Sequence, residues 1–378
     1  MTRNAYLPFG RPDFSNEEIE AVARVMRSGW VGMGPETIAF EGELATSMQA
    51  SEVVSVNSCT SALFLSLLAS GVGPGDEVIT PSLTWCATAN AALYLGAQPI
   101  FCDVDPKTLS VTPETVLAVL TAKTKAVVPV HYGGLAVDVV ALRRALPAHV
   151  TIVEDAAHAL GARYPDGTPV GSSSNLTCFS FYANKNLSTG EGGAIAVSDP
   201  QVAERLRSLR QNGMPSNAWM RFVDPKVRGA GSAIELGYKA NYIDLQAAIG
   251  RVQLKRQPDF QKRRLEVAQE YARLLPSLET QAGLQQASHA RHLYVVKLPV
   301  GAGRMGRDEV LTEMRARNFG AAVHYTPLHT MPLYDTRAVH LPVTDRVSHQ
   351  ILTLPISASM TVEDARDAAR ALVESARL

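Results

Sequence analysis

Short apolar runs alternate with helical stretches between residues 53 and 200. The apolar runs are nearly continuous in Val, Ile and other large residues, which is typical of strands whose two sheet faces are both covered by helices. The runs are VVSVN, EVIT, PIFCDV, KAVVPV, TIVEDA, LTCFSF and GAIAVS, and helices are expected between them at about 59–70, 84–95, 113–121 and 138–146. The pattern predicts a three-layer α/β/α domain with a mostly parallel sheet, whose binding sites lie at the carboxyl ends of the strands.

The segments that flank this region carry further helix signals. SNEE at 15–18 is a capping-box pattern and opens a helix that is expected to end near Gly29. Residues 213–235 mix Gly, Pro, Asn and Ser with scattered charges and are interpreted as a connection. A long helical stretch is expected after it, over about 242–275.

The last third of the chain predicts a second, smaller unit. It contains the apolar run HLYVVKL, a charged helix near 307–317 and a terminal helix from about residue 362. A length of 378 residues favours two domains. We therefore expect a large domain over residues 1–250 and a small α+β domain over residues 251–378.

Composition narrows the class of protein. Hydrophobic residues make up 46% of the chain and charged residues 19%, which is enough for a large core. Lys plus Arg and Asp plus Glu both total 36, and no basic block stands out, so we expect no binding to nucleic acid or to an anionic membrane. The N-terminal residues lack the apolar core of a signal peptide, and no apolar run is long enough to span a bilayer. The four cysteines form no C-x-x-C pair and are interpreted as reduced thiols of a cytoplasmic protein.

Candidate chemistry lies at the predicted strand ends. NSCTSAL at 57–63 follows the strand VVSVN and begins a helix, where hydroxyls and free backbone amides form a ready site for a phosphate. An ordinary helix cap is the alternative, because Ser and Thr supply caps routinely. Trp85 begins a helix after ITPSLT and offers a flat face to a planar ligand, unless it is a core residue.

Two acids and a lysine follow at later strand ends. Glu154 and Asp155 end the strand TIVED, and strand periodicity sends their side chains to opposite faces. Asp155, nearest the strand end, is the one expected over the sheet, with capping of the next helix as the alternative. Lys185 follows Phe181 and Tyr182 in SFYANKNLSTGEGG. Partial desolvation there would lower its pKa and free the amine as a nucleophile, whereas a solvated surface lysine is the alternative.

These features are more informative together than singly. A phosphate cradle, an aromatic plate, a strand-end acid and a lysine on successive strand ends of one sheet suit pyridoxal phosphate. That cofactor requires a phosphate site, a lysine for its Schiff base and an acid beside its pyridine nitrogen.

Six segments, in order along nearly the whole chain, carry a resemblance to a known family. They are RSGWVGMGPETIAFE, GVGPGDEVITPSLTWCATANAALYLGAQPIFCDVD, EDAAHALGA, SFYANKNLSTGEGGAIAVSD, GYKANYIDLQAAIGRVQLKR and VHYTPLH. In these segments the chain resembles the sugar aminotransferases of the DegT/DnrJ/EryC1/StrS family, in the aspartate aminotransferase superfamily of fold type I. The resemblance implies a pyridoxal-phosphate-dependent transaminase that acts on a nucleotide-linked sugar.

The resemblance also implies roles for single residues. Lys185 would bind the cofactor as a Schiff base, Asp155 would hold the pyridinium proton, and Trp85 would stack on the ring. Two positions depart from the pattern of the family. Cys59 stands where many members have glycine, and His158 stands where many have glutamine near the ring oxygen of the cofactor.

The same resemblance implies how the cofactor phosphate is bound. Thr60, Ser61 and Ser180 would bind it within one chain. Asn241, in GYKAN at 237–241, would reach it from the second subunit of a homodimer.

The reaction implied is the transfer of an amino group from glutamate to a keto group of the sugar. Some members with histidine at the lysine position dehydrate sugars, and Lys185 argues against that reaction. Through the same resemblance, GYKAN implies amination at C4 of a 4-keto-6-deoxyhexose. The alternative among enzymes is a transaminase that acts on a C3 keto sugar or on a keto-cyclitol. The alternative among other classes of protein is a non-catalytic regulatory paralogue that keeps the fold. His324 and His329 in VHYTPLH are interpreted as substrate contacts or as loop packing. No acid or cysteine cluster accompanies them, so we expect no metal site.

Overall fold

A seven-stranded sheet with the order β1-β7-β6-β5-β4-β2-β3 forms the centre of the larger part of the molecule. The computed structural model describes residues 2–215, 222–223, 232–299, 305–334 and 339–378. Neighbouring strands are parallel except where β7 runs against β1 and β6. The strands are β1 (Glu52–Val56), β2 (Glu77–Pro81), β3 (Gln98–Cys102), β4 (Thr124–Val127), β5 (Thr151–Asp155), β6 (Leu176–Ser180) and β7 (Gly193–Val197).

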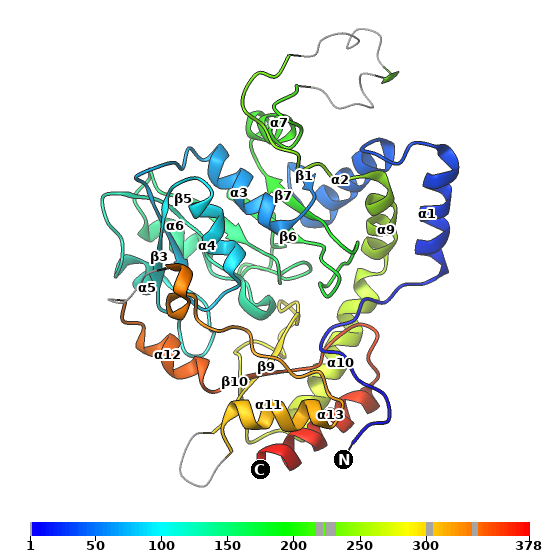
Figure 1. Ribbon diagram of the computed structural model, residues 1–378, viewed down its shortest axis with the longest axis vertical. Helices are drawn as coiled ribbons and strands as arrows, with labels where there is room; N and C mark the ends of the chain where they lie inside the picture. Colours follow the sequence, from blue (N-terminus) through cyan, green and yellow to red (C-terminus); the bar gives the residue numbers. More distant parts are fainter. Residues whose placement is uncertain (1, 216–221, 224–231, 300–304, 335–338) are drawn as a thin grey trace.

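Helices cover both faces of this sheet (Figure 1). Successive strand residues enter different cores: Val53 packs into the core on one face and Val54 into the core on the other. The first core is shared with α2 (Pro35–Met48), α5 (Pro113–Leu117), α6 (Val139–Ala145) and α9 (Asp244–Lys255), and the second with α3 (Cys59–Ala69), α4 (Cys86–Leu93) and α7 (Pro200–Leu209). The predicted three-layer α/β/α fold with a mostly parallel sheet is confirmed.

A second, antiparallel sheet has the order β10-β9-β8. Its strands are β8 (Glu279–Thr280), β9 (Tyr294–Lys297) and β10 (Ile351–Leu354), and the helices near it are α10 (Gln257–Leu274), α11 (Arg307–Ala316), α12 (Pro342–Ser348) and α13 (Val362–Ala376). The antiparallel sheet and the helices α10, α11 and α13 share one hydrophobic core, and Leu7 packs into it. Both ends of the chain lie beside α13 (Figure 1). Short 3₁₀ turns complete the described chain at Tyr132–Gly134, Leu328–Thr330 and Pro332–Tyr334. The domain boundary expected at residue 250 stays a prediction.

Local signals explain where helices begin and end. α1 (Asn16–Ser28) opens on the predicted capping box of Ser15 and Glu18 and ends at Gly29, whose φ is 74°. The long helical stretch expected over about 242–275 is present as two consecutive helices, α9 and α10, which meet at Arg256. Pro258 lies in the first turn of α10, where its missing N–H costs no hydrogen bond, and its ring cannot continue a preceding helix. Most of the connection expected at 213–235 lies outside the described residues.

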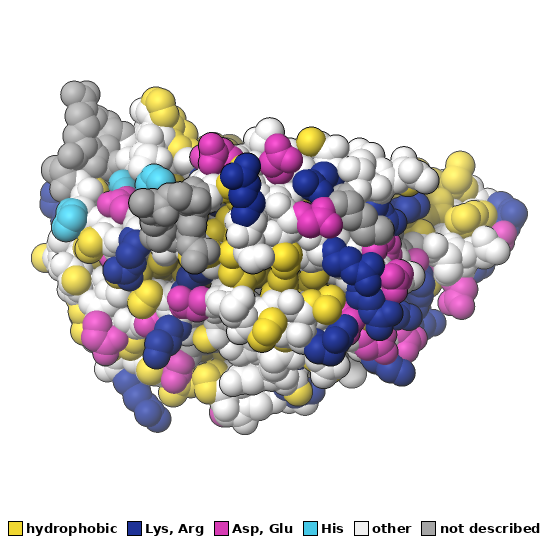
Figure 2. Space-filling view, turned by 90° about the horizontal axis from the view of Figure 1, so that it is seen from below, with side chains coloured by type: hydrophobic (Ala, Val, Ile, Leu, Met, Phe, Trp, Pro, Cys, Tyr) yellow, Lys and Arg dark blue, Asp and Glu magenta, His cyan; other side chains and the backbone are white. Residues whose placement is uncertain are grey.

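Basic and acidic side chains are intermixed on the face drawn in Figure 2. Several ion pairs join separate elements; for example, Arg366 of α13 lies 2.7 Å from Glu270 of α10, and Arg3 lies 2.8 Å from Asp364. The four cysteines are free thiols, as predicted. Within the described ranges, no helix has both the length and the apolar character needed to cross a membrane.

Candidate active site

A cavity of about 430 Å³ lies at the carboxyl ends of the central strands. Its walls come from the start of α3, the segment between β2 and α4, the end of β5 and the loop after β6, together with residues 324–325 of the C-terminal part. The predicted site residues that line it are Thr60, Trp85, Asp155, His158, Ser180, Lys185 and His324. The cavity therefore brings together side chains that are far apart in the sequence.

The start of α3 forms one end of the cavity. Ser58 caps the helix by accepting a hydrogen bond from the Ser61 amide at 3.1 Å. The amides of Cys59 and Thr60 lie in the first turn, where a helix offers them no acceptor. A Cβ at Gly193 would lie 2.7 Å from the Cys59 nitrogen, so glycine is needed for the close approach of β7. Free amides and a hydroxyl at a helix N-terminus suit a phosphate.

Asp155 ends β5 and lines the cavity. Thr88 donates its hydroxyl to Oδ2 at 2.8 Å, and the Ala157 amide donates to Oδ1 at 3.1 Å. Burial raises the pKa of Asp155 above its usual value, while these two hydrogen bonds and the charge of Lys185 act against the increase. A cationic group bound beside the carboxylate would favour its ionised form, as a protonated ring nitrogen would.

Glu154 points to the opposite face, as predicted for consecutive strand residues. Its carboxylate is fully buried and accepts hydrogen bonds from His131, Tyr164, Ser173 and Asn175 at 2.5–2.8 Å. Burial raises the pKa of Glu154, but the hydrogen bonds from His131, Ser173 and Tyr164 outweigh it and lower the pKa overall. Glu154 therefore has a structural role: it joins β5 to the segments that carry His131, Tyr164, Ser173 and Asn175.

Lys185 lies in the loop after β6, with its amide bonded to the Tyr182 carbonyl at 2.9 Å. Its side chain is partly buried and lines the cavity. Burial lowers the pKa of Lys185 to about 8, although the nearby groups of Cys59 and Asp155 act in the other direction. About half of the amines are therefore neutral at pH 8, so that Lys185 can act as a nucleophile. The interpretation as a solvated surface lysine does not hold.

Aromatic and histidine side chains form another wall. Trp85 is 61% exposed, and its ring lies 6.0 Å from that of Tyr325. The Gly133 amide donates to Nδ1 of His158 at 3.3 Å, so a neutral His158 carries its proton on Nε2, which lies 3.0 Å from the Tyr325 hydroxyl. Burial lowers the pKa of His158 well below its usual value and that of His324 to about 3, so both rings are neutral.

Two predicted site residues, Ser61 and His329, are absent from the cavity lining in the described chain. The Ser61 hydroxyl donates to the Asn57 side chain at 2.7 Å. His329 lies 2.7 Å from the Ser82 hydroxyl and 2.9 Å from the Asp345 carboxylate. The loop-packing alternative fits His329 better than a direct substrate contact.

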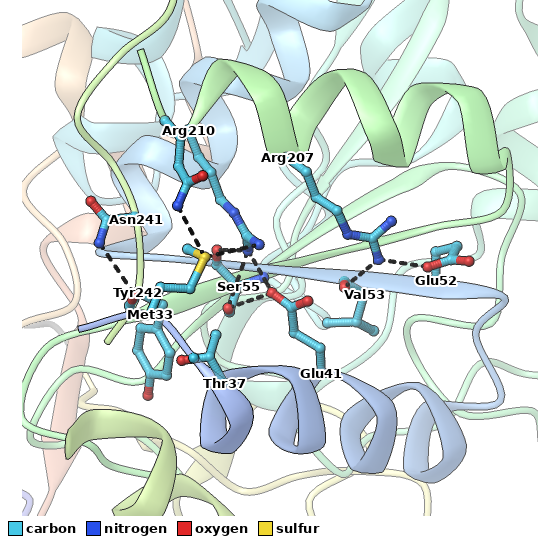
Figure 3. Close-up of polar contacts among 12 residues, drawn as sticks. Met33, Thr37, Glu41, Glu52, Val53, Ser55, Arg207, Arg210, Asn241 and Tyr242 are labelled. Carbon is cyan, nitrogen blue, oxygen red and sulfur yellow. Dashed lines mark hydrogen bonds and ion pairs between the residues drawn. The ribbon is translucent and has the colours of Figure 1, made fainter. Parts of the chain in front are cut away.

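Asn241 also lies outside the cavity lining of its own chain, as far as the chain is described. It forms an antiparallel bridge with Val56 at the end of β1. Figure 3 shows the buried Arg210 next to this edge, bonded to Glu41 and, at 2.6 Å, to the Ser55 carbonyl. Asn241 is thus fixed beside the site of its own chain, and its contact with a partner's phosphate stays a prediction.

Thr88 and Tyr325 are site residues that were not singled out from the sequence. Thr88 follows Thr84 by four residues at the start of a predicted helix, which places both on one face, so the sequence held a signal for this pair. The partner of Tyr325 is His158, 167 residues away, and no local pattern indicates that contact.

Comparisons with known proteins point to one family. Residues 12–373 match the DegT/DnrJ/EryC1/StrS aminotransferase family. The spore coat polysaccharide biosynthesis protein SpsC of Bacillus subtilis (strain 168) is 40% identical over 390 residues, which cover 99% of each chain. The aminotransferase TlmJ from Streptoalloteichus hindustanus is 34% identical with a TM-score of 0.89, over 98% of this chain and 99% of that one. DesV of S. venezuelae, solved in complex with a ketimine intermediate, is 34% identical with a TM-score of 0.85, over 95% and 94% of the two chains.

The fold and the cavity define a pyridoxal-phosphate-dependent transferase of fold type I. The chain belongs to the DegT/DnrJ/EryC1/StrS aminotransferase family, and it is a sugar aminotransferase.

The residues present fit pyridoxal phosphate. The free amides at the start of α3 suit its phosphate, and Asp155 is a buried carboxylate that a protonated ring nitrogen would stabilise. Lys185 supplies an amine whose pKa of about 8 suits Schiff-base formation. All three lie on the same cavity.

Proposed function

We propose that this enzyme transfers the amino group of L-glutamate to C4 of a nucleotide-linked 4-keto-6-deoxyhexose. The observation that carries the proposal is that Lys185, Asp155 and the start of α3 line one cavity. GYKAN at 237–241 supports C4 as the position, because this form, through the family resemblance, implies enzymes that aminate 4-keto-6-deoxy sugars. The name of SpsC, a protein of spore coat polysaccharide biosynthesis, supports a surface polysaccharide as the destination of the amino sugar.

Lys185 and Asp155 are the proposed catalytic residues. Pyridoxal phosphate, when bound, supplies the amino-group carrier and the ring that stores the electron pair. The Lys185 amine, with a pKa of about 8, takes the proton from the α-carbon of the donor and delivers it to the C4′ position. Asp155 holds a proton on the ring nitrogen, because its carboxylate lies in the cavity with two donors fixing its plane.

Other side chains orient the cofactor. Trp85 would present its exposed indole face to the ring. His158, a neutral ring whose Nε2 lies 3.0 Å from the Tyr325 hydroxyl, would lie with Tyr325 on the side of the ring oxygen. Thr60 and Ser180 bind the phosphate with the amides of α3.

We propose a homodimer in which Asn241 completes the phosphate site of the neighbouring chain, and its fixed place outside its own cavity supports this arrangement. Ser61 supports the phosphate site indirectly, because its amide donates to Ser58 at 3.1 Å and its hydroxyl donates to Asn57 at 2.7 Å in the first turn of α3. His324 contacts the sugar, since it lines the cavity with Nδ1 held 2.9 Å from the Thr353 hydroxyl.

A panel of ketones tests the acceptor. The protein is converted to its pyridoxamine form with glutamate, freed of donor, and mixed with UDP- and dTDP-linked 4-keto-6-deoxy sugars, a 3-keto isomer and a keto-cyclitol. We expect a 4-keto-6-deoxy nucleotide sugar to restore the absorbance of the lysine-bound cofactor. Recovery with the 3-keto isomer or the cyclitol instead would replace the C4 assignment with the alternative. Recovery with none of them would contradict a nucleotide-sugar acceptor of this kind.

A further inference from the structure

Two threonines form a directed hydrogen-bond chain that ends on Asp155. The Thr88 hydroxyl lies 2.8 Å from Oδ2 of Asp155, and the Thr84 hydroxyl lies 3.0 Å from that of Thr88. An ionised carboxylate only accepts hydrogen bonds, so the Thr88 proton points to Asp155 and the Thr88 oxygen accepts from Thr84. Both threonines are buried, with 0% and 2% of their surfaces exposed, so water does not replace these bonds.

The Thr88 hydroxyl holds Oδ2 of the Asp155 carboxylate, and the Ala157 amide holds Oδ1. Both donors favour the ionised form, whereas burial of Asp155 disfavours it. Removal of the Thr88 hydroxyl would leave a buried carboxylate oxygen without its protein donor, which is costly for a charged group.

The electrostatic setting makes this donor important. The titratable groups that face the Asp155 carboxylate are Lys185, His131, Cys59, Cys178 and Tyr325. Of these, Lys185 and His131 lower the pKa of Asp155. The Thr88 hydroxyl is a neutral donor, so its support of the Asp155 carboxylate does not depend on the charge of Lys185.

We propose that Thr88, oriented by Thr84, is a positioning residue that keeps Asp155 ionised and aimed at the ring nitrogen of the cofactor. The inference rests on the proposed role of Asp155. Thr84 immediately precedes Trp85, the N-cap of α4, so the start of this helix supplies both the proposed stacking face and the donor chain.

A buried threonine in the neighbouring strand provides a matched control. Thr177 of β6 is fully buried, and within the described chain its hydroxyl has no hydrogen-bond partner. It pairs in register with Glu154 and is absent from the cavity lining. Thr177→Val therefore makes the same chemical change as Thr88→Val without removing a donor from Asp155.

The test compares the binding of pyridoxamine phosphate with that of its 1-deaza analogue, in which a C–H group replaces the ring nitrogen. Dissociation constants are measured on the full-length protein freed of cofactor, so turnover is not needed. We expect Thr88→Val to weaken binding of pyridoxamine phosphate by at least about tenfold, the effect of losing one hydrogen bond to a charged group, and to leave binding of the analogue nearly unchanged. Thr88→Ser should keep the wild-type preference, and so should Thr177→Val.

An unchanged preference in Thr88→Val, or an equal loss in Thr177→Val, would overturn the proposal. Asp155→Asn separates this failure from failure of the proposed function. If Asp155→Asn itself keeps the preference for the ring nitrogen, the assignment of Asp155 is wrong. If Asp155→Asn loses the preference and Thr88→Val keeps it, the donor chain is wrong. Should Thr88→Val not fold, Thr84→Val decides: a smaller loss of preference supports the chain, and no loss overturns it.

Discussion

Glu154 and Asp155 are consecutive residues of β5, yet their carboxylates belong to separate hydrogen-bond networks on opposite faces of the sheet. Asp155 is held by Thr88 and the Ala157 amide at the cavity. Glu154 is bonded to four side-chain donors on the other side, among them His131 at 2.8 Å. The first network presents a charge to a ligand and the second joins parts of the fold, so substitutions at these neighbours should have different effects.

Asp155→Asn should keep the fold and lose most of the activity. A neutral amide cannot hold a proton on the ring nitrogen, and loss of such a group typically lowers kcat by roughly 100-fold or more. The measurement is kcat together with the thermal unfolding temperature. A rate near that of the wild type would mean that another acid performs this role.

Glu154→Gln should mainly lower stability. The amide group of glutamine would place N–H donors against the donors of His131 and Tyr164, at a cost of about 2 kcal/mol in the free energy of unfolding. Denaturant unfolding measures the loss, and kcat per folded molecule should change little. Unchanged stability with lost turnover would contradict the structural role.

Lys185→Ala should abolish turnover but retain binding of pyridoxamine phosphate. The amine is needed to bond to the cofactor and to move the proton, while the phosphate site at α3 is unaffected. Absorbance of the bound cofactor and steady-state assays measure the two properties. Appreciable transamination by the alanine variant would show that Lys185 is not the Schiff-base residue.

The pH dependence of cofactor attachment should report the pKa of Lys185. With a pKa of about 8 the neutral amine, and so the rate of Schiff-base formation, increases about fivefold from pH 7 to pH 8 and less than twofold from pH 8 to pH 9. A lysine at the ordinary value of 10.5 would instead show a rate that rises about tenfold per pH unit through this range. Stopped-flow absorbance after addition of pyridoxal phosphate to the apoprotein distinguishes the two.

The lowered pKa of Lys185 also makes the free energy of unfolding depend on pH. Between about pH 8 and 10.5 the folded chain binds fewer protons at Lys185 than the unfolded chain does. This group therefore makes the folded state more stable as pH rises through that window.

A shared site predicts complementation between inactive chains. Lys185→Ala lacks the amine, and Asn241→Asp should place a negative charge against the phosphate of the neighbour. In a mixed dimer one site would receive both intact residues, so mixing should restore up to a quarter of the sites if chains pair at random. Activity of verified heterodimers is the measurement, with each homodimer as a control. No recovery would count against a phosphate site completed by Asn241.

The regular elements were predictable because they depend on local patterns. Continuous apolar runs marked the buried strands, and the Ser15–Glu18 capping box marked the start of α1. α2 and α7 lie in segments for which no helix was predicted. α2 begins after Gly34, which supplies no side-chain cap, whereas α7 does carry a local signal, the N-cap Asp199 followed by Pro200, that the prediction did not use. The interruption at Arg256 follows from Pro258, whose ring cannot continue a preceding helix. The prediction of a long helical stretch did not use this local signal.

The site residues that could be predicted from the sequence are those that lie at or just after the end of a predicted strand. Asp155 ends a buried strand and Lys185 lies in the loop after the next one, and parallel strands bring their carboxyl ends to one edge. The Tyr325–His158 contact joins residues from separate parts of the chain, and tertiary packing decides it. His329 was considered as a substrate contact from its sequence motif, but its hydrogen bonds to Ser82 and Asp345 hold it in the loop and away from the cavity lining of the described chain.

The most direct test of the central claim follows the transferred nitrogen itself. The enzyme is incubated with ¹⁵N-labelled L-glutamate and a dTDP- or UDP-linked 4-keto-6-deoxyhexose, and the product is examined by NMR. Lys185→Ala serves as the control and should give no labelled sugar. The account predicts ¹⁵N bonded to C4 of the hexose. Nitrogen at C3, or a sugar that carries no label although glutamate has lost its amino group, would contradict it.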